Sequence, residues 1–179
     1  MIEGAVAHYQ ATGKRNFLDI AIKYADCVCR EIGNGPQQKK YVPGHQIAEM
    51  ALVKLYMATG DKKYLDQAKF FLDTRGYPSR KDAYSQAHKP VVEQDEAVGH
   101  AVRAVYMYSG MADVAAITGD SSYIKVTLGC DNLTDMELLN AALSLYLFLR
   151  KSIKTLSEKL KAEKPKIISM EQPQERMAA

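Results

Sequence analysis

A segment that recurs along the chain constrains the fold more than any other feature of the sequence. YQATGKRNFLDIA (residues 9–21) matches YMATGDKKYLDQA (residues 56–68), and ITGDSSYIK (residues 117–125) is a weaker third copy. Gly13, Gly60 and Gly119 mark the common register, and the two intervals between them differ. Unequal intervals exclude tetratricopeptide and ankyrin arrays, whose repeats are fixed near about 33 or 34 residues.

Each copy of the repeat predicts a helical hairpin. An apolar helix ends, a glycine adopts the left-handed conformation, and a new helix begins within a few residues. Asp61 and Ser121 are expected to cap the second helices of the later two hairpins. After Gly60, apolar residues recur at helical spacing and predict a buried stripe. Its members are Tyr64, Leu65, Ala68, Phe71 and Leu72.

Two further connections are long, polar and contain proline: residues 33–44 and 76–94. Short turns therefore alternate with long loops along the chain. A stack or ring of hairpins places all the short turns at one end and all the long loops at the other. Long ordered loops are usually functional, so we expect any site at the long-loop end.

The apolar periodicity predicts an all-α chain. The expected helices cover residues 2–11, 15–32, 45–58, 62–75 and 95–117, a short stretch from about residue 121, and residues 134–161. The fifth of them is apolar on nearly every face, with Val102, Val105 and Tyr106 expected in the interior. His100 lies near the start of this helix, and a titratable ring in a buried helix indicates either a structural contact or a functional role.

The last third of the chain differs in character. Residues 138–149 are apolar but too few to span a bilayer, and basic residues follow them. This helix either packs on the core, which is favoured, or lies on a membrane surface. Residues 164–179 are expected to be disordered. The predicted organisation is a helical domain over residues 1–126, a divergent helical tail over 127–163 and a disordered end.

Composition narrows the possible functions. A net charge of +3, with both signs interspersed over most of the chain, gives no indication of nucleic acid binding. Cys27, Cys29 and Cys130 lack the spacing of a disulfide framework and suggest free thiols in a reducing compartment. Cys27 and Cys29 are two apart on an expected helix and do not face one another, so no shared metal is expected. The first residues do not resemble a signal peptide, which favours a cytoplasmic location.

Three segments carry a family resemblance. They are EGAVAHYQATGKRNFLDIAIKYAD, VPGHQIAEMALVKLYMATGDKKYLDQAKFFLDTRG and YSQAHKPVVEQDEAVGHAVRAVYMYSGMADVAAITGD, in this order. Together they resemble the β-L-arabinofuranosidase family of glycoside hydrolases (family 127 type) over about residues 1–125. The resemblance implies an α/α toroid, in which inner and outer helices alternate. The chain would form part of an incomplete (α/α)6 barrel, with an extra C-terminal helix.

The resemblance also implies a sugar-binding role for two histidines. His45 matches the histidine of the PGH motif, and His100 matches that of VGHAVR. A neutral imidazole can both donate and accept hydrogen bonds, which suits sugar hydroxyls. Without the family, His45 is equally a residue at a helix start and His100 a satisfied core histidine. Weaker candidates are Glu49, Glu93, Gln94 and Glu96; carboxylates near a helix start are favoured by the helix dipole, and that explanation is preferred.

The family resemblance implies chemistry that this sequence lacks. Its members use a cysteine nucleophile at a zinc site and a glutamate acid/base, in place of two carboxylates. No counterpart of those motifs occurs here, so we expect no catalytic residue and no metal ligand, with zinc confined to the full-length family. The expectation is a fragment that keeps part of a pocket for an arabinofuranoside-type sugar and is inactive alone. The alternative is a non-enzymatic interaction module whose tail helix binds a protein or membrane; uncovered apolar faces also predict self-association.

Overall fold

The computed structural model describes residues 1–77 and 82–128 of the chain. The elements are α1 (Ile2–Thr12), α2 (Asn16–Glu31), α3 (Ile47–Thr59), α4 (Lys62–Thr74), the 3-10 helix η1 (Val91–Glu93), α5 (Ala101–Thr118) and α6 (Ser121–Leu128). Within these two ranges there is no strand beyond one isolated bridge between Ile32 and Lys39. The predicted all-α class is confirmed.

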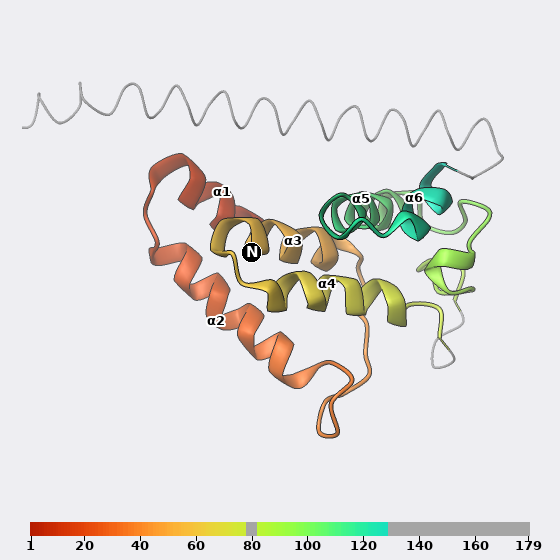
Figure 1. The fold of residues 1–179 in the computed structure, drawn as a ribbon, viewed down its shortest axis with the longest axis horizontal. Helices are drawn as coiled ribbons and strands as arrows, with labels where there is room; N and C mark the ends of the chain where they lie inside the picture. The colour runs from red at the N-terminus through yellow and green to blue at the C-terminus, as the bar shows by residue number, and fades with distance from the viewer. Residues whose placement is uncertain (78–81, 129–179) are drawn as a thin grey trace, which may run out of the picture.

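The helices pair into three hairpins, α1–α2, α3–α4 and α5–α6, which lie side by side (Figure 1). The first helices of the hairpins are neighbours, because α3 packs against both α1 and α5. The second helices lie on the outside of this row, where α2 packs against α4. The predicted alternation of inner and outer helices is therefore present in the described part of the chain.

The short turns have the predicted geometry. Gly13, Gly60 and Gly119 adopt φ values of 71°, 76° and 76°, all in the left-handed region. Each glycine N–H donates to a carbonyl one turn earlier in the preceding helix. This is the left-handed cap that ends a helix, and a residue with a Cβ would adopt it less readily.

One of the two predicted helix caps is confirmed and the other is wrong. Asp61 caps α4, since its side chain accepts from the Lys63 backbone N–H. In the third hairpin Ser121 is already the first helical residue, so it does not cap α6. Asp120 takes this role, because its Oδ1 accepts from the Ser122 backbone N–H at 3.1 Å. It occupies the same position in the repeat as Asp61.

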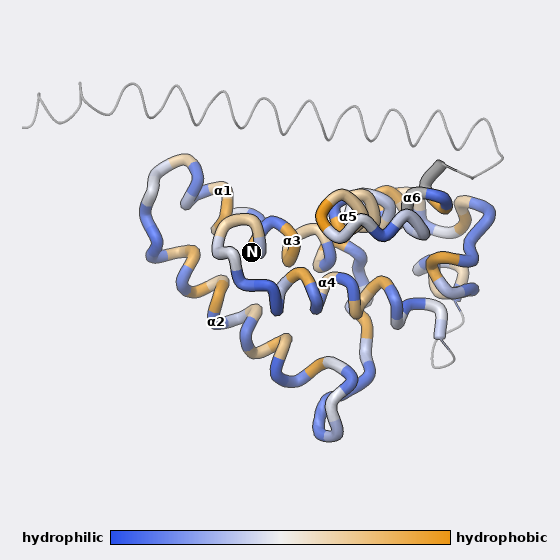
Figure 2. The backbone as a smooth tube through the Cα atoms, in the orientation of Figure 1, coloured by the Kyte–Doolittle hydropathy of each residue, from blue (hydrophilic) through white to orange (hydrophobic). Residues whose placement is uncertain are grey.

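The outer helices alternate between hydrophilic and hydrophobic residues, as Figure 2 shows for α2 and α4. The predicted stripe of α4 is buried throughout: Tyr64, Leu65, Ala68, Phe71 and Leu72. It joins a single core cluster that includes residues from all six helices. The helical spacing of apolar residues was therefore sufficient to find the buried face of this helix.

A hydrogen bond that occurs twice joins successive hairpins. The Tyr64 hydroxyl on α4 donates to Asp26 Oδ1 on α2 at 2.7 Å. The equivalent hydroxyl one repeat later, that of Tyr123 on α6, donates to Asp73 on α4. Each pair therefore connects the outer helix of one hairpin to that of the next.

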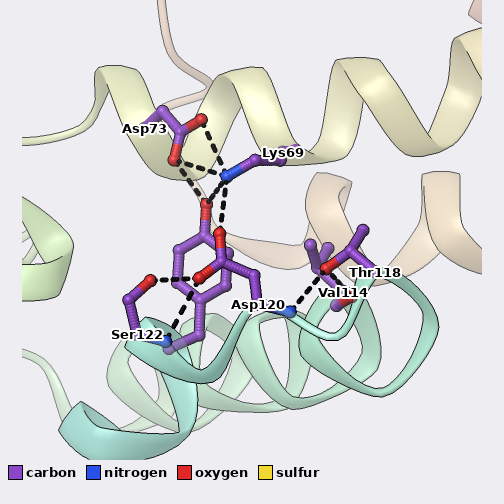
Figure 3. Close-up of polar contacts among 7 residues, drawn as sticks. Lys69, Asp73, Val114, Thr118, Asp120 and Ser122 are labelled. Carbon is purple, nitrogen blue, oxygen red and sulfur yellow. Dashed lines mark hydrogen bonds and ion pairs between the residues drawn. The ribbon is translucent and has the colours of Figure 1, made fainter.

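A lysine reinforces the second of these connections. Lys69 Nζ lies 3.2 Å from Asp73 Oδ2 and 3.1 Å from Asp120 Oδ2, so it bridges α4 and the turn before α6 (Figure 3). Its amino group also donates to the Tyr123 hydroxyl at 2.9 Å. The hydroxyl of Tyr123 lies between a cation and a carboxylate, in a residue with no exposed surface.

Removing this hydroxyl is expected to destabilise the fold. Tyr123→Phe should lower the free energy of unfolding by about 1–2 kcal/mol, because a buried charge-assisted hydrogen bond is lost. Tyr24→Phe, at an exposed tyrosine of α2, should change it by less than about 0.5 kcal/mol. Urea denaturation followed by circular dichroism measures both, and equal midpoints for the two variants would contradict the assignment.

The start of α5 differs from the prediction. This helix begins at Ala101 and not at residue 95, because Gly99 is in the left-handed region and His100 is extended. Val102, expected in the interior, is 52% exposed. The helix instead buries the face that carries Ala104 and Met107. One face of α5 is thus open in the described structure.

The predicted tail helix over residues 134–161 and the disorder expected over 164–179 lie outside the described residues, so the division into a domain and a tail stays a prediction. Across residues 1–77 and 82–128, no helix is both long and apolar enough to cross a membrane.

Candidate functional site

The two candidate histidines lie at corresponding places in adjacent hairpins. His45 is two residues before the start of α3, and His100 is the N-cap of α5. Since α3 and α5 pack together, both residues lie where a long loop enters an inner helix. His45 is exposed and His100 is half-buried.

Each histidine ring contacts a tyrosine. The His45 ring centroid lies 5.7 Å from that of Tyr106, at an interplanar angle of 66°. The His100 centroid lies 5.3 Å from that of Tyr84, at 78°. Both are edge-to-face arrangements, the geometry that aromatic quadrupoles favour. These contacts restrict the orientation of both imidazoles.

Arg103 connects the two halves of the site. Its guanidinium carbon lies 5.0 Å from the centroid of the Tyr84 ring, in a cation–π contact. Its Nη1 donates to the Gly44 carbonyl at 2.5 Å, directly before His45. One side chain of α5 thus contacts both long loops. His45, Tyr84, His100, Arg103 and Tyr106 are called the histidine cluster from here on.

The cluster favours a neutral His45. Loss of water around part of the ring lowers the pKa of His45 below 6.5, and the positive charge of Arg103 lowers it further. Positive charge on His100 and on Arg75 acts in the same direction, more weakly than that of Arg103. His45 therefore retains one donor and one acceptor nitrogen near neutral pH.

Arg103→Met should raise the pKa of His45 without restoring it to 6.5, because desolvation remains. Because the pKa of His45 is lower in the folded than in the unfolded chain, the unfolded chain takes up a proton first as the pH falls below 6.5. The free energy of unfolding therefore keeps the full contribution of the neutral ring above pH 6.5 and loses it toward lower pH. Titration of the imidazole by NMR measures the shift. Lys23→Met, which removes a positive charge on α2, is the control; an equal shift there, or none with Arg103→Met, would contradict the account.

A buried ion pair lies beneath the cluster. Arg75 Nη2 donates to Glu49 Oε1 at 3.2 Å, and both side chains are almost completely buried. The same guanidinium donates to the carbonyls of Pro43 at 3.0 Å and Ser85 at 3.3 Å. Arg75 therefore fastens both long loops to α3. Burial raises the pKa of the Glu49 carboxyl, while the charge of Arg75 opposes that effect.

The weaker candidates are not gathered in the cluster. Glu49 has no exposed surface and pairs with Arg75, so it does not reach a ligand in this conformation. Gln94 is buried and donates to the Lys89 carbonyl at 3.1 Å within its own loop. Glu93 and Glu96 are exposed on that loop. A sugar-binding role for these four residues stays a prediction.

Three members of the cluster were missed in the sequence: Tyr84, Arg103 and Tyr106. Arg103 follows His100 by about one helical turn, a spacing that could have identified it. Tyr84 could not be found in this way, because the loop that carries it reaches α5 only through tertiary contacts. One such contact is the His100 N–H, which donates to the Tyr84 carbonyl at 3.0 Å.

The described residues do not fit a zinc site. Cys27 is an exposed and Cys29 a partly buried free thiol on α2. Burial raises the pKa of the Cys29 thiol to about 11, which opposes the thiolate that zinc requires. Within residues 1–77 and 82–128, no group of three or more His, Cys, Asp or Glu side chains is arranged to hold a metal ion.

The fold is part of an α/α toroid: the α-hairpins lie side by side, and polar side chains gather where the long loops enter the inner helices. The model of the GH127 catalytic domain, β-L-arabinofuranosidase, matches residues 1–132. The chain belongs to this family of glycoside hydrolases. A curated relative from Bifidobacterium longum subsp. longum, a non-reducing end β-L-arabinofuranosidase, is 36% identical over an alignment of 146 positions, which covers 69% of this chain and 22% of that protein.

Solved structures agree with this assignment. A GH127 β-arabinofuranosidase is 95% identical, with a TM-score of 0.71 over 72% of this chain and 20% of its own. A GH127 β-L-arabinofuranosidase from Geobacillus stearothermophilus T6 is 45% identical, with a TM-score of 0.65 over 72% of this chain and 23% of its own. The chain thus corresponds to about a fifth of the length of these relatives.

Proposed function

We propose that residues 1–128 form one wall of a sugar-binding site in a β-L-arabinofuranosidase-type glycoside hydrolase. One observation carries the proposal: His45 and His100 lie at the starts of two neighbouring inner helices, and Arg103 links them by contacting the Gly44 carbonyl and the Tyr84 ring. The names of the relatives supply the substrate class, a non-reducing terminal β-L-arabinofuranoside.

The cluster has the groups that a furanose requires. A neutral imidazole at His45 donates to one hydroxyl and accepts from another. The exposed ring of Tyr84 offers an apolar surface to the C–H faces of a sugar. Arg103 carries donors beyond the one used by Gly44. Sugar sites commonly combine a few placed polar groups with aromatic surface.

Saturation-transfer NMR with methyl β-L-arabinofuranoside tests this proposal. The chain is expected to bind the sugar weakly, and His45→Ala or His100→Ala should each reduce the affinity about tenfold, since each removes hydrogen bonds to the ligand. His8→Ala, on α1, is the matched control and should leave binding unchanged. The proposal fails if the wild-type chain gives no transfer, or if all three variants bind equally.

We also propose that this chain alone does not hydrolyse the sugar. The family resemblance implies a cysteine nucleophile, held at zinc, and a glutamate acid/base, and neither Cys27 nor Cys29 is placed for such a role. Release of the chromophore from an aryl β-L-arabinofuranoside is expected to match the rate without protein. Turnover by the pure chain that disappears with a chelator would contradict the expectation.

A second candidate, self-association, is supported by exposed apolar side chains at the starts of two inner helices, α3 and α5. Val102 of α5 is 52% exposed, and Ile47 of α3 is 36% exposed. Such surface favours contact with another chain or with further helices. Light scattering separates the cases: a monodisperse monomer at high concentration would exclude self-association through this surface.

A further inference from the structure

We propose that Gln86 is the positioning residue that sets His45 and His100 relative to one another, so that both rings face the same ligand. The inference deepens the proposed function and rests on it. Gln86 lies in the long loop before α5 and is not a member of the histidine cluster. Its side chain nevertheless connects the two histidine segments.

The backbone of Gln86 is unusual. It has a φ of 55°, and it is the one residue other than glycine with positive φ in the described part of the chain. Side chains with a Cβ rarely adopt this conformation unless the surroundings impose it, and such positions concentrate at functional sites. Gln86 also has no exposed surface. Its buried amide lies between Gln46, the N-cap of α3, and the backbone that leads into α5.

The side-chain amide of Gln86 forms hydrogen bonds to the start of α3 and to the start of α5. Its Oε1 accepts from Gln46 Nε2 at 2.6 Å, and Gln46 directly follows His45. Its Nε2 donates to the His100 carbonyl at 3.2 Å and to the Val98 carbonyl at 2.8 Å. One planar group therefore holds the start of α3 and the start of α5 at a fixed separation.

Other contacts hold Gln86 itself in place. Gln94 Nε2 donates to the Gln86 carbonyl at 2.8 Å. Gln46 Nε2 also donates to the Ser85 carbonyl at 2.6 Å, and Arg75 donates to that same carbonyl. Glutamine suits this position because it supplies an acceptor and a donor on one terminal group. Residues that bind no ligand but orient those that do are expected around a preorganised site.

Two substitutions and one matched control test the proposal on the full chain. Gln86→Met keeps length and volume but removes the amide, and Gln86→Gly also relieves the positive φ. Gln67→Met is the control, since Gln67 is buried on α4 and its Nε2 has no hydrogen-bond partner within the described residues. Nuclear Overhauser effects report the His45–Tyr106 and Tyr84–His100 ring contacts, and methyl β-L-arabinofuranoside affinity is measured in parallel.

Both Gln86 variants should lose these ring contacts and bind the sugar about tenfold more weakly, while helix content is retained. Gln67→Met should match the wild type. Ring contacts that persist in both Gln86 variants overturn the proposal. An equal loss of ring contacts in Gln67→Met, or unfolding of both Gln86 variants, also overturns it, because either result indicates a general structural role for these residues. If the wild type binds no sugar, the proposed function fails and the ring contacts alone decide the positioning role.

Discussion

Glu49→Ala is expected to lower the free energy of unfolding by about 3–5 kcal/mol, the range for removing one partner of a buried ion pair. The substitution leaves the Arg75 guanidinium with no counter-charge at a site where its side chain is 1% exposed. It also empties the buried space that the rest of the Glu49 side chain fills beyond its Cβ, which adds to the loss. Urea denaturation followed by circular dichroism gives the free energy.

A double variant separates charge from packing. Glu49→Leu with Arg75→Met replaces the pair by apolar groups of similar volume, which is often neutral for stability. It should recover much of the loss seen in Glu49→Ala, although the Pro43 and Ser85 carbonyls lose their donor. If Glu49→Ala is no less stable than the wild type, the pair does not fasten the loops as described.

Gly99→Ala is expected to disrupt the loop before α5. Gly99 has a φ of 78°, and a Cβ there would lie 2.0 Å from the Ala83 carbonyl oxygen, far inside van der Waals contact. The backbone must therefore shift, and the shift should break the neighbouring hydrogen bond from the His100 N–H to the Tyr84 carbonyl. Thermal unfolding should show a loss of at least about 3 kcal/mol, from the left-handed strain and the clash together.

Gly119→Ala provides the control for that substitution. Its φ of 76° is nearly the same, but a Cβ there would meet nothing within 4 Å. Only the conformational strain should appear, about 1–2 kcal/mol. An equal loss of stability in the two variants would contradict the prediction, because it would mean that the contact of the new Cβ with the Ala83 carbonyl costs nothing.

The parts of the fold that follow from local sequence were predictable. Gly13, Gly60 and Gly119 each follow an apolar helical stretch, and a left-handed cap depends only on neighbouring residues. The buried stripe of α4 follows from spacing alone. The family resemblance supplied the toroid and the choice of His45 and His100 as site candidates.

The remaining features depend on contacts between distant segments. The true start of α5 is set by Gly99 and by the His100 N–H, whose acceptor lies in the loop at Tyr84. Burial of Arg75 was not predictable from its type, because arginine is rarely buried without a partner. Its partner, Glu49, is on another helix. The positive φ of Gln86 is likewise imposed by its tertiary surroundings.

Imidazole NMR of the four histidines during titration with methyl β-L-arabinofuranoside tests the central claim most directly. If His45 and His100 form one wall of the sugar site, their ring signals should shift together along a single saturation curve. Signals of His8, on α1, and His88, in the long loop, should move far less. Shifts confined to His8 or His88, or separate curves for His45 and His100, would contradict the claim that these two residues face one sugar.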